Sequence, residues 1–381
     1  MQAPPFHQRY RIPLLCSAAA LVVSGIAVGM LLSAAGGNVT ALIRMAPQDP
    51  IAQVAEQIEQ EFFYVPAGHY DGVYYYAIAI DPFAMGAANE LLDLAAHRYG
   101  HPAYGWLGWL FSLGNPDWVP QALLIVSLLG IAVAAFFASL IAQHLGATAW
   151  GGLVVALNPG LVFAVTTDTS EAASAAVLSI ALYLWLKERR QAAGIVLIAL
   201  CFFKFQLILV PVALGLWEVV LYLRGRRDRD TQNIVALLAA GPIMFIVWMV
   251  YLRQQFGELP ISGGPEFLSL PFIGFFDTMR DLAQVHLMSP ENVQIASAEL
   301  PIVACLVVLI TIAVVRAARL RHPLDAVFAL QGAFLLLLNW WNLFYPKDLL
   351  RSLAIPIPLL IAVLYIGRRH ELSETSTAPP A

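Results

Sequence analysis

Long apolar stretches alternate along this chain with short clusters of charged residues. The stretches are each about 15 to 25 residues long, and a membrane hydrocarbon core of about 30 Å is crossed by ~20 apolar residues in a helix. The pattern therefore predicts an all-α polytopic membrane protein with about ten transmembrane helices. We expect these helices near residues 12–33, 118–143, 150–165, 172–186, 193–203, 205–223, 233–252, 301–315, 324–341 and 352–366.

The first apolar stretch follows Arg9 and Arg11 and ends in small residues, as a signal peptide does. A signal peptide has an apolar region of only ~7–15 residues, which this stretch exceeds, so we interpret it as an uncleaved anchor. The two predicted helices on either side of Phe203 share one broken apolar stretch, and their boundary is the hardest to place.

The composition supports a membrane protein and excludes a soluble domain and a nucleic-acid-binding protein. Hydrophobic residues make up 60% of the 381 residues and charged residues only 12%, whereas a soluble domain carries ~25% charged residues. The net charge of -4 and the absence of a basic stripe exclude nucleic acid as a partner. Cys16, Cys201 and Cys305 each lie in an apolar stretch, with no spacing typical of zinc sites or disulfides.

Basic residues predict the orientation of the chain. With the N-terminus in the cytoplasm, fourteen of the 21 lysines and arginines fall in cytoplasmic segments, as the positive-inside rule requires. We expect one transmembrane domain over residues 1–366 and a cytoplasmic tail over 367–381. The membrane is expected to be a bacterial plasma membrane. Two long segments, 34–117 and 253–300, then form extracytoplasmic loops.

The first of these loops is too long for a connector and too apolar for a disordered linker, so it is expected to fold on the membrane surface. Residues 49–61 have acids spaced as on a polar helix face, and residues 70–81 form a short aromatic helix that ends before Pro82. Residues 103–113 predict an interfacial helix with Trp106 and Trp109 at headgroup level. The start of the second loop, GELPISGGPEF, fits either a mobile lid or a plain connector.

Four outer carboxylates are candidates for chemistry, and each has a structural alternative. Asp71 begins the short aromatic helix and is either its N-cap or a general base for a substrate hydroxyl. Asp81 is either a helix-end residue or a second functional carboxylate. Asp168 and Glu171 have the spacing of a capping box. They could instead, or in addition, line a cavity and hold sugar hydroxyls or a divalent cation.

Three outer cations are candidates for binding an anion. Lys204 interrupts an apolar stretch, where a lone cation at the centre of a span costs about 2.5–3.5 kcal/mol, so it lies near a helix end or is paired in a cavity. Arg351 begins the last predicted helix from the same side, where contact with lipid headgroups is the alternative. Arg98 lies between His97 and His101. Three cations directed at one leaving phosphate would stabilise its charge.

Five segments together resemble the GT-C superfamily of polyprenyl-phosphate-sugar-dependent glycosyltransferases, in particular bacterial mannosyltransferases and aminoarabinose transferases. The segments are YDGVYYYAIAIDPF, HRYGHPAYGWLGWLFSLG, NPGLVFAVTTDTSEA, the stretch around Lys204, and YPKDLLRSLAIPIPLL, in the order found in that superfamily. The resemblance implies a catalytic carboxylate at Asp71 and a lipid-phosphate donor held by Lys204, Arg351 and Arg98. Gly72 follows Asp71 where some members have a second acid, which leaves the need for Mg²⁺ or Mn²⁺ open.

The expected activity is therefore transfer of a hexosyl or pentosyl group from a polyprenyl-phosphate donor, within membrane lipid, to an extracytoplasmic glycan, lipid or protein, with inversion. Two other classes stay open: a transporter or lipid flippase, and a non-catalytic partner in cell-envelope glycan assembly. A transporter typically shows two related halves and several charges near the membrane midplane, and this sequence shows neither.

Overall fold

The computed structural model describes residues 6–58, 61–66, 68–225, 229–261, 268–284 and 290–376. Every regular element in these ranges is a helix, and a single backbone bridge joins Leu268 to Leu338. The predicted all-α class is confirmed for this part of the chain. The GGPEF stretch, the arginines at 226 and 227, and the end of the tail lie outside the described residues.

Five of the described helices are long and apolar enough to cross a membrane, and two bent pairs raise the number to seven if each pair is one span. The long helices are α1 (Phe6–Ala34), α6 (Val119–His144), α11 (Leu209–Leu223) extended by η5 (Phe205–Ile208), α12 (Arg229–Phe256) and α14 (Pro290–Arg319). The bent pairs join η4 (Ala149–Gly152) and α7 (Leu153–Ala156) to α8 (Pro159–Thr166), and α17 (Pro346–Ala354) to α18 (Ile357–Ser376). These helices indicate an integral membrane protein.

Three further apolar helices coincide with predicted spans but are shorter: α9 (Glu171–Leu186), α10 (Arg190–Leu200) and α15 (Pro323–Leu335). Each of the ten predicted spans therefore falls on a helix or on a pair of helices. Five of these spans, or seven if each bent pair is counted as one span, meet the length expected for a crossing. Proline explains both bends. Pro159 begins α8 after Asn158, whose side chain accepts a hydrogen bond from the Leu161 N–H, and Pro356 cannot donate a backbone bond between α17 and α18.

The segment from residue 35 to 118 folds into short helices, three of which fall in the segments 49–61, 70–81 and 103–113 whose patterns predicted helices. The short helices are η1 (Val39–Leu42), α2 (Ala52–Ile58), α3 (Gly72–Ile80), η2 (Ala88–Leu91), α4 (Ala95–Tyr99), α5 (Ala103–Phe111) and η3 (Pro116–Trp118). In α5 the side chain of Trp109 is exposed, but Trp106 packs inward and donates its indole N–H to the carbonyl of Pro82. Of the two predicted interfacial tryptophans, Trp109 is thus exposed and Trp106 is partly buried.

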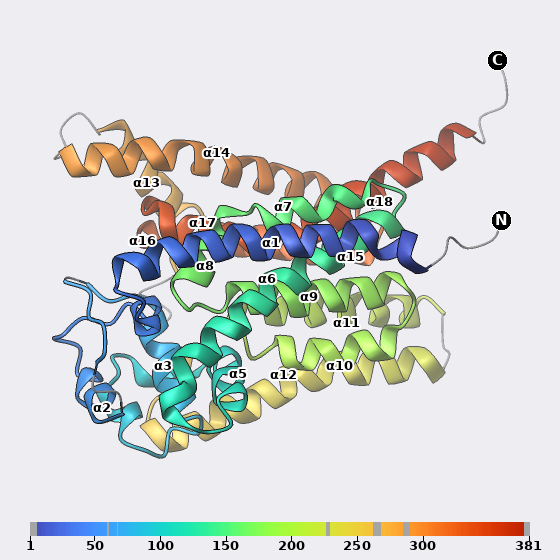
Figure 1. The fold of residues 1–381 in the computed structure, drawn as a ribbon. Coiled ribbons are helices and arrows are strands. Elements are labelled where there is room, and N and C mark those ends of the chain that lie inside the picture. The colour runs from blue at the N-terminus through green and yellow to red at the C-terminus, as the bar shows by residue number, and fades with distance from the viewer. Residues whose placement is uncertain are drawn as a thin grey trace.

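The long helices run side by side, with both termini at one end of the bundle and the short helices of residues 35–118 at the other (Figure 1). Helix α6 lies at the centre and packs against α1, α5 and α9. Gly130 allows the close approach of α6 to α9, because a Cβ there would lie 2.8 Å from the backbone of Ala172. Helices α13 (Ile273–Ala283) and α16 (Trp340–Phe344) pack together at the end away from the termini.

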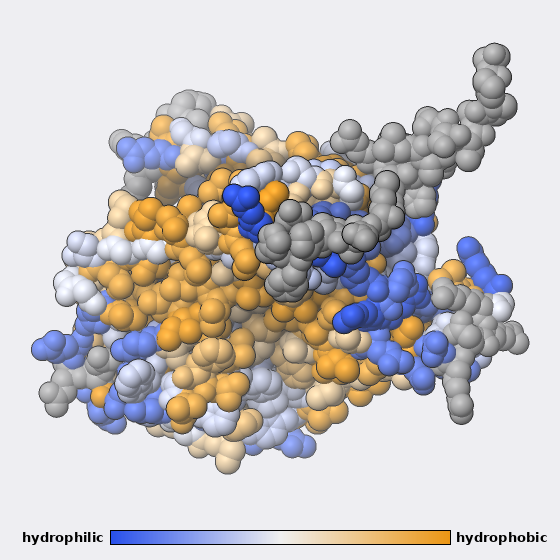
Figure 2. Space-filling view, turned by 45° about the vertical axis from the view of Figure 1, so that its right-hand side comes forward, coloured by the Kyte–Doolittle hydropathy of each residue, from blue (hydrophilic) through white to orange (hydrophobic). Residues whose placement is uncertain are grey.

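Apolar side chains cover the middle of the bundle surface, and hydrophilic ones gather toward its ends (Figure 2). Large exposed apolar side chains lie along α1, α12 and α14, including Val22, Met30, Val247 and Val308. Large exposed apolar side chains spread over several helices are typical of a chain that membrane lipid surrounds, which agrees with an integral membrane protein.

Candidate active site

Four segments distant in the sequence meet at the end of the bundle away from the termini. They are the start of α3, the turn between α8 and α9, the turn between α10 and η5, and α17. Gly160 lets α8 approach α17, because a Cβ at Gly160 would lie 2.2 Å from the carbonyl oxygen of Leu350. These contacts bring Asp71, Glu171, Lys204 and Arg351 into one cluster.

Arg351 is the centre of this cluster. Its Nη2 lies 2.8 Å from Oδ2 of Asp71, and its Nε lies 2.8 Å from Oε1 of Glu171. Its Nη1 donates to the hydroxyl of Tyr70 at 2.7 Å and lies 3.8 Å from Oδ1 of Asp348. The Arg351 side chain is only 8% exposed, so each of these charge-assisted contacts acts in a largely dry environment.

Asp71 is the residue just before α3, but its side chain makes no capping hydrogen bond to that helix. The carboxylate instead faces Arg351 and, at 3.9 Å, Nη1 of Arg98. Burial alone would raise the pKa of Asp71, but the charges of Arg351 and Arg98 outweigh it and hold the pKa well below its usual range. With 35% of its side chain exposed, Asp71 is an accessible carboxylate that these cations keep ionised.

Lys204 supplies the second cation of the cluster. Its Nζ lies 2.6 Å from Oε1 of Glu171, the same oxygen that Arg351 contacts. Glu171 is completely buried, whereas 22% of the Lys204 side chain is exposed. Lys204 is therefore paired beside a cavity, as the second of the two sequence hypotheses predicted, and it lies in the turn between α10 and η5.

The cavity has a volume of about 330 Å³ and combines two kinds of surface. Its polar part consists of two histidines and six further side chains: Asp71, Tyr75, Lys204, Gln206, Asn342 and Ser352. Its apolar part consists of side chains from several segments: Phe205, Ile261, Leu268, Phe334 and Leu338. A cavity of this kind suits a ligand with a charged end and an apolar end.

The two histidines in the cavity wall, His97 and His101, add no cation. Burial lowers the pKa of His97, and it lowers that of His101 well below its ordinary value, so both rings are neutral near pH 7. The Nδ1 of His97 lies 3.0 Å from the carbonyl oxygen of Pro260, which fixes this ring against the start of the second long loop.

Tyr70 and Asp348 belong to the cluster but were not singled out in the sequence. The Tyr70 hydroxyl donates to Oδ1 of Asp348 at 2.6 Å, and the cationic groups of Lys347 and Arg351 lie 4.6 and 4.9 Å from the centre of its ring. Burial raises the pKa of Tyr70 far above its ordinary value, so the phenol stays protonated. Two signals were present in the sequence: Tyr70 precedes Asp71, and Asp348 stands one helical turn before Arg351.

The predicted capping box at Asp168 and Glu171 is wrong. Helix α9 begins at Glu171 after Ser170, and its N-cap makes no side-chain hydrogen bond. Asp168 adopts a left-handed backbone conformation with φ 45°, and neither of its carboxylate oxygens has a partner in the described part of the chain. Burial raises the pKa of Asp168 well above its ordinary value. Burial therefore favours the neutral form of Asp168, whose carboxyl group pairs with none of the cations around Arg351.

Asp81 lies apart from the cluster, at the other end of α3. Its carboxylate accepts hydrogen bonds from the N–H groups of Met85 and Gly86, at 2.9 and 2.8 Å, and from the side-chain amide of Asn89. These bonds fold the turn after α3, which agrees with the structural alternative for Asp81. Neither Asp81 nor Asp168 faces the cavity, and the described residues contain no group of three or more side chains suited to a metal ion.

Comparisons with known proteins give no match: no protein-family model fits this sequence, and no curated protein is significantly similar to it. A functional assignment therefore depends on the chemistry of the cluster and its cavity. Three carboxylates, from Asp71, Glu171 and Asp348, face three cations, from Arg98, Lys204 and Arg351. An incoming anion can therefore take the place of one of these carboxylates as the ion-pair partner of a cation, and the cations themselves stay in place.

Gly72 is required for Asp71 to reach this cluster. A Cβ at Gly72 would lie 2.6 Å from the carbonyl oxygen of Thr167 and 2.7 Å from that of Ile43, and neither backbone atom can rotate away. We expect Gly72→Ala to push α3 outward and to lower the free energy of unfolding by about 1–3 kcal/mol. Thermal unfolding in detergent measures this effect. Gly29→Ala is the matched control, since a Cβ there meets nothing within 4 Å, and equal melting temperatures for the two variants would contradict the prediction.

Proposed function

We propose that this protein is a membrane glycosyltransferase that moves a sugar from a polyprenyl-phosphate donor to an acceptor hydroxyl, with inversion at the anomeric carbon. The observation that carries the proposal is the convergence of Asp71, Glu171, Lys204 and Arg351 beside one cavity with polar and apolar walls. These residues come from four separate segments, and the sequence had indicated each of them as a candidate. The resemblance to the GT-C superfamily agrees with this chemistry.

The donor lies with its phosphate at the charged end of the cavity and with its prenyl chain along the apolar wall. Lys204 is the first phosphate ligand, because it lines the cavity and part of its side chain is free. Arg98 and Arg351, which both pair with Asp71, complete the electrostatic environment of the phosphate. Preorganised cations of this kind stabilise the charge that develops on a leaving phosphate.

Asp71 is the general base of the proposed reaction. Its carboxylate takes the proton of the acceptor hydroxyl while the acceptor oxygen bonds to the anomeric carbon, and the bond from that carbon to the phosphate oxygen breaks. The lowered pKa of Asp71 makes it a weak base without donor. A bound donor phosphate partly neutralises the positive charge of Arg351, Arg98 and Lys204, and this raises the pKa of Asp71. Asp71 therefore becomes an effective base only when donor is bound.

The same proposal places the cluster outside the cytoplasm. If α9, α10 and α15 cross the membrane together with the long helices and the two bent pairs, the chain has ten crossings, and the basic segments lie on the side of both termini. The short helices α2 to α5 then fold on the extracytoplasmic surface, where a flipped lipid donor and a glycan, lipid or protein acceptor meet.

Transfer or hydrolysis by the purified protein tests this function. The full chain in lipid nanodiscs is incubated with a panel of radiolabelled polyprenyl-phosphate hexoses and pentoses, and release of polyprenyl phosphate is followed. Turnover of one donor supports a glycosyltransferase and separates it from a non-catalytic partner. Transbilayer movement of these lipids in proteoliposomes without cleavage of any donor would overturn the proposal in favour of a flippase.

Lys204→Gln is expected to raise the KM for the donor at least tenfold, because the variant loses the cation nearest the cavity while Arg351 still neutralises Glu171. The kinetic constants of purified variants at saturating acceptor measure the effect. Lys187→Gln, at the end of α9 away from the cavity, is the matched control and should leave KM unchanged. A Lys204→Gln enzyme with native KM would remove Lys204 from the donor site.

A further inference from the structure

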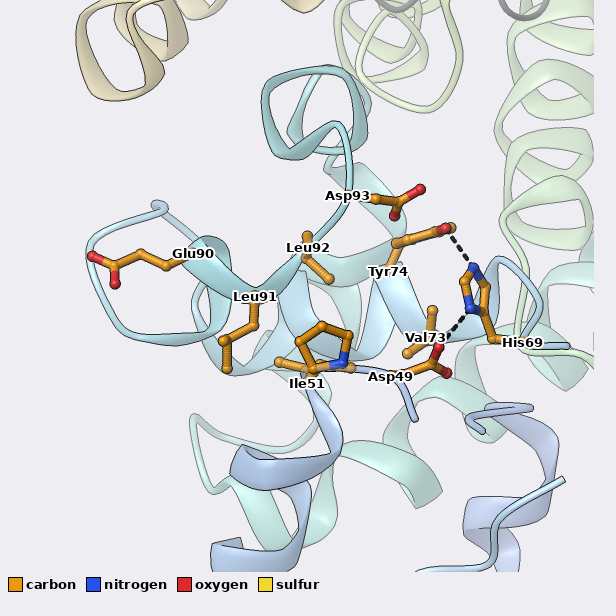
Figure 3. Close-up of a pocket in the computed structure, with 10 residues that line it drawn as sticks. Asp49, Ile51, His69, Val73, Tyr74, Glu90, Leu91, Leu92 and Asp93 are labelled. Atoms are coloured by element: carbon orange, nitrogen blue, oxygen red, sulfur yellow. Dashed lines mark hydrogen bonds and ion pairs between the residues drawn. The ribbon is translucent and has the colours of Figure 1, made fainter. Parts of the chain in front are cut away.

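The cavities outside the candidate active site differ in whether their polar groups are already paired. One cavity, of about 270 Å³, lies beside α3 and is lined by residues from Asp49 to Asp93 (Figure 3). His69 in its wall has two partners: its Nδ1 is 2.7 Å from Oδ1 of Asp49, and its Nε2 is 2.8 Å from the hydroxyl oxygen of Tyr74. These three side chains therefore pair with one another and not with a ligand.

A groove of about 490 Å³ lies at the other end of the bundle, where both termini are (Figure 1). Helices α11 and α14 both pack against α15. Residues of α11 form one wall of the groove, residues at the end of α14 form the other, and α15 contributes the floor. Ala326 and Ala329 keep this floor low, because neither side chain extends beyond its Cβ. All the lining side chains except that of Arg224 are apolar.

The length of the groove matches one leaflet of a membrane. Its α11 wall extends from Ala213 to Arg224, a rise of roughly 16 Å along the helix at 1.5 Å per residue. Half of a hydrocarbon core of ~30 Å is about 15 Å. The candidate membrane span that contains α11 ends at Leu223. Arg224 is the first residue beyond this span, which places it at the level of the lipid phosphates.

The positive charge of Arg224 has no partner in the described part of the chain. Its side chain is exposed and makes no hydrogen bond or ion pair there. The acids of the two neighbouring helices are already paired. Oε1 of Glu218 in α11 lies 3.0 Å from Nη1 of Arg190, and Oδ1 of Asp325 in α15 lies 3.7 Å from Nη1 of Arg316. The groove therefore combines an apolar interior with one uncompensated cation at its end.

We propose that this groove binds one anionic phospholipid, whose phosphate pairs with Arg224 and whose acyl chain lies between α11 and α14. The headgroup decides which lipid binds. The choline of phosphatidylcholine is itself a cation that competes with Arg224 for the phosphate, whereas phosphatidylglycerol carries no such group. The groove lies at the end of the bundle away from Asp71, so the proposal does not depend on the proposed glycosyltransferase function.

Native mass spectrometry of the full-length protein measures binding of this lipid. The protein in non-ionic detergent is titrated with dioleoyl phosphatidylglycerol or with dioleoyl phosphatidylcholine, and the dissociation constant of the first bound lipid is determined for each. We expect phosphatidylglycerol to bind about fivefold more tightly or better, because one interfacial arginine contributes roughly that factor toward an anionic lipid. Equal affinities for the two lipids would contradict the proposal.

Arg224→Gln should remove this preference by lowering the affinity for phosphatidylglycerol to that for phosphatidylcholine. Arg224 is exposed, so the substitution leaves the packing of the helices intact. Arg11→Gln is the matched control, because Arg11 is also an exposed arginine at the end of the bundle near the termini, but it lies on α1 and does not line the groove. This control should keep the native preference. An Arg224→Gln protein that also kept it would remove Arg224 from the site and overturn the proposal.

Ala329→Phe tests the apolar part of the groove, because the larger side chain occupies the floor where the acyl chain lies. This variant should lose the tight binding of phosphatidylglycerol, whereas Ala333→Phe, at an exposed position of α15 outside the groove, should retain it. Native affinity in Ala329→Phe would place the lipid elsewhere and refute the site. A dimer that Ala329→Phe abolishes while lipid binding is unchanged would identify the groove as a contact between two copies of the chain, and the lipid site would be refuted as well.

Discussion

Asp71→Asn is expected to slow sugar transfer at least about a hundredfold, with donor binding changed by only a few fold. A positioned general base contributes roughly 10²–10⁴ in rate, and an amide at the same position cannot take the acceptor proton. The phosphate ligand Lys204 is untouched by the substitution, and the carbonyl oxygen of the new amide can still accept from Arg351. The kcat and KM of the purified variant, measured at saturating acceptor, provide the comparison.

Folding must be shown to survive in this variant, because Asp71 shares Arg351 with a buried carboxylate. We expect its melting temperature and its elution on size exclusion to stay close to those of the native protein, since Glu171 continues to neutralise Arg351. Asp117→Asn, in the exposed η3 helix, controls for loss of a carboxylate elsewhere in the outer segments and should leave kcat unchanged. A well-folded Asp71→Asn protein with native kcat would refute the assignment of the base.

The helices were predictable from sequence because their signal is local. A run of apolar residues indicates a helix wherever it packs, and the short helices α2, α3 and α5 appear in the segments whose patterns predicted them. Span length was harder to predict, because Pro159 and Pro356 lie in apolar stretches that read as continuous and bend them by 49° and 48°.

The partners of the charged residues were not predictable in this way. The spacing of Asp168 and Glu171 fits a capping box, but it does not show whether either carboxylate pairs instead with a cation far along the chain. Glu171 pairs with Lys204, 33 residues along the chain, and with Arg351, 180 residues along. Such contacts depend on how α9, α10 and α17 pack, which no local pattern encodes.

The same argument explains why residue type alone could not decide between the two roles expected for Asp71. Aspartate before a helix most often caps it, and here the backbone position is that of a cap while the side chain serves Arg351. The close approach of Gly72 to Ile43 and Thr167 turns the start of α3 into the cluster. A glycine directly after the aspartate was the one local sign of that approach.

Arg351→Met is expected to cause the largest loss of stability, roughly 3–5 kcal/mol, because it leaves buried carboxylates without their main partner. Glu171 is fully buried, and Lys204 alone would then neutralise it, while Asp71 would keep only the longer contact to Arg98. Activity should be lost as well. Equilibrium unfolding of the detergent-solubilised protein, or its melting temperature, measures the loss.

Two further variants distinguish a broken ion pair from loss of packing around Arg351. Adding Glu171→Gln to Arg351→Met removes the uncompensated charge and should recover part of the lost stability, so that the two substitutions are not additive. Arg280→Met removes an arginine that is 62% exposed and paired with Asp277, and it should change stability by less than about 1 kcal/mol. If Arg351→Met proves as mild as Arg280→Met, Arg351 does not organise the cluster, and the residues around it are held by helix packing alone.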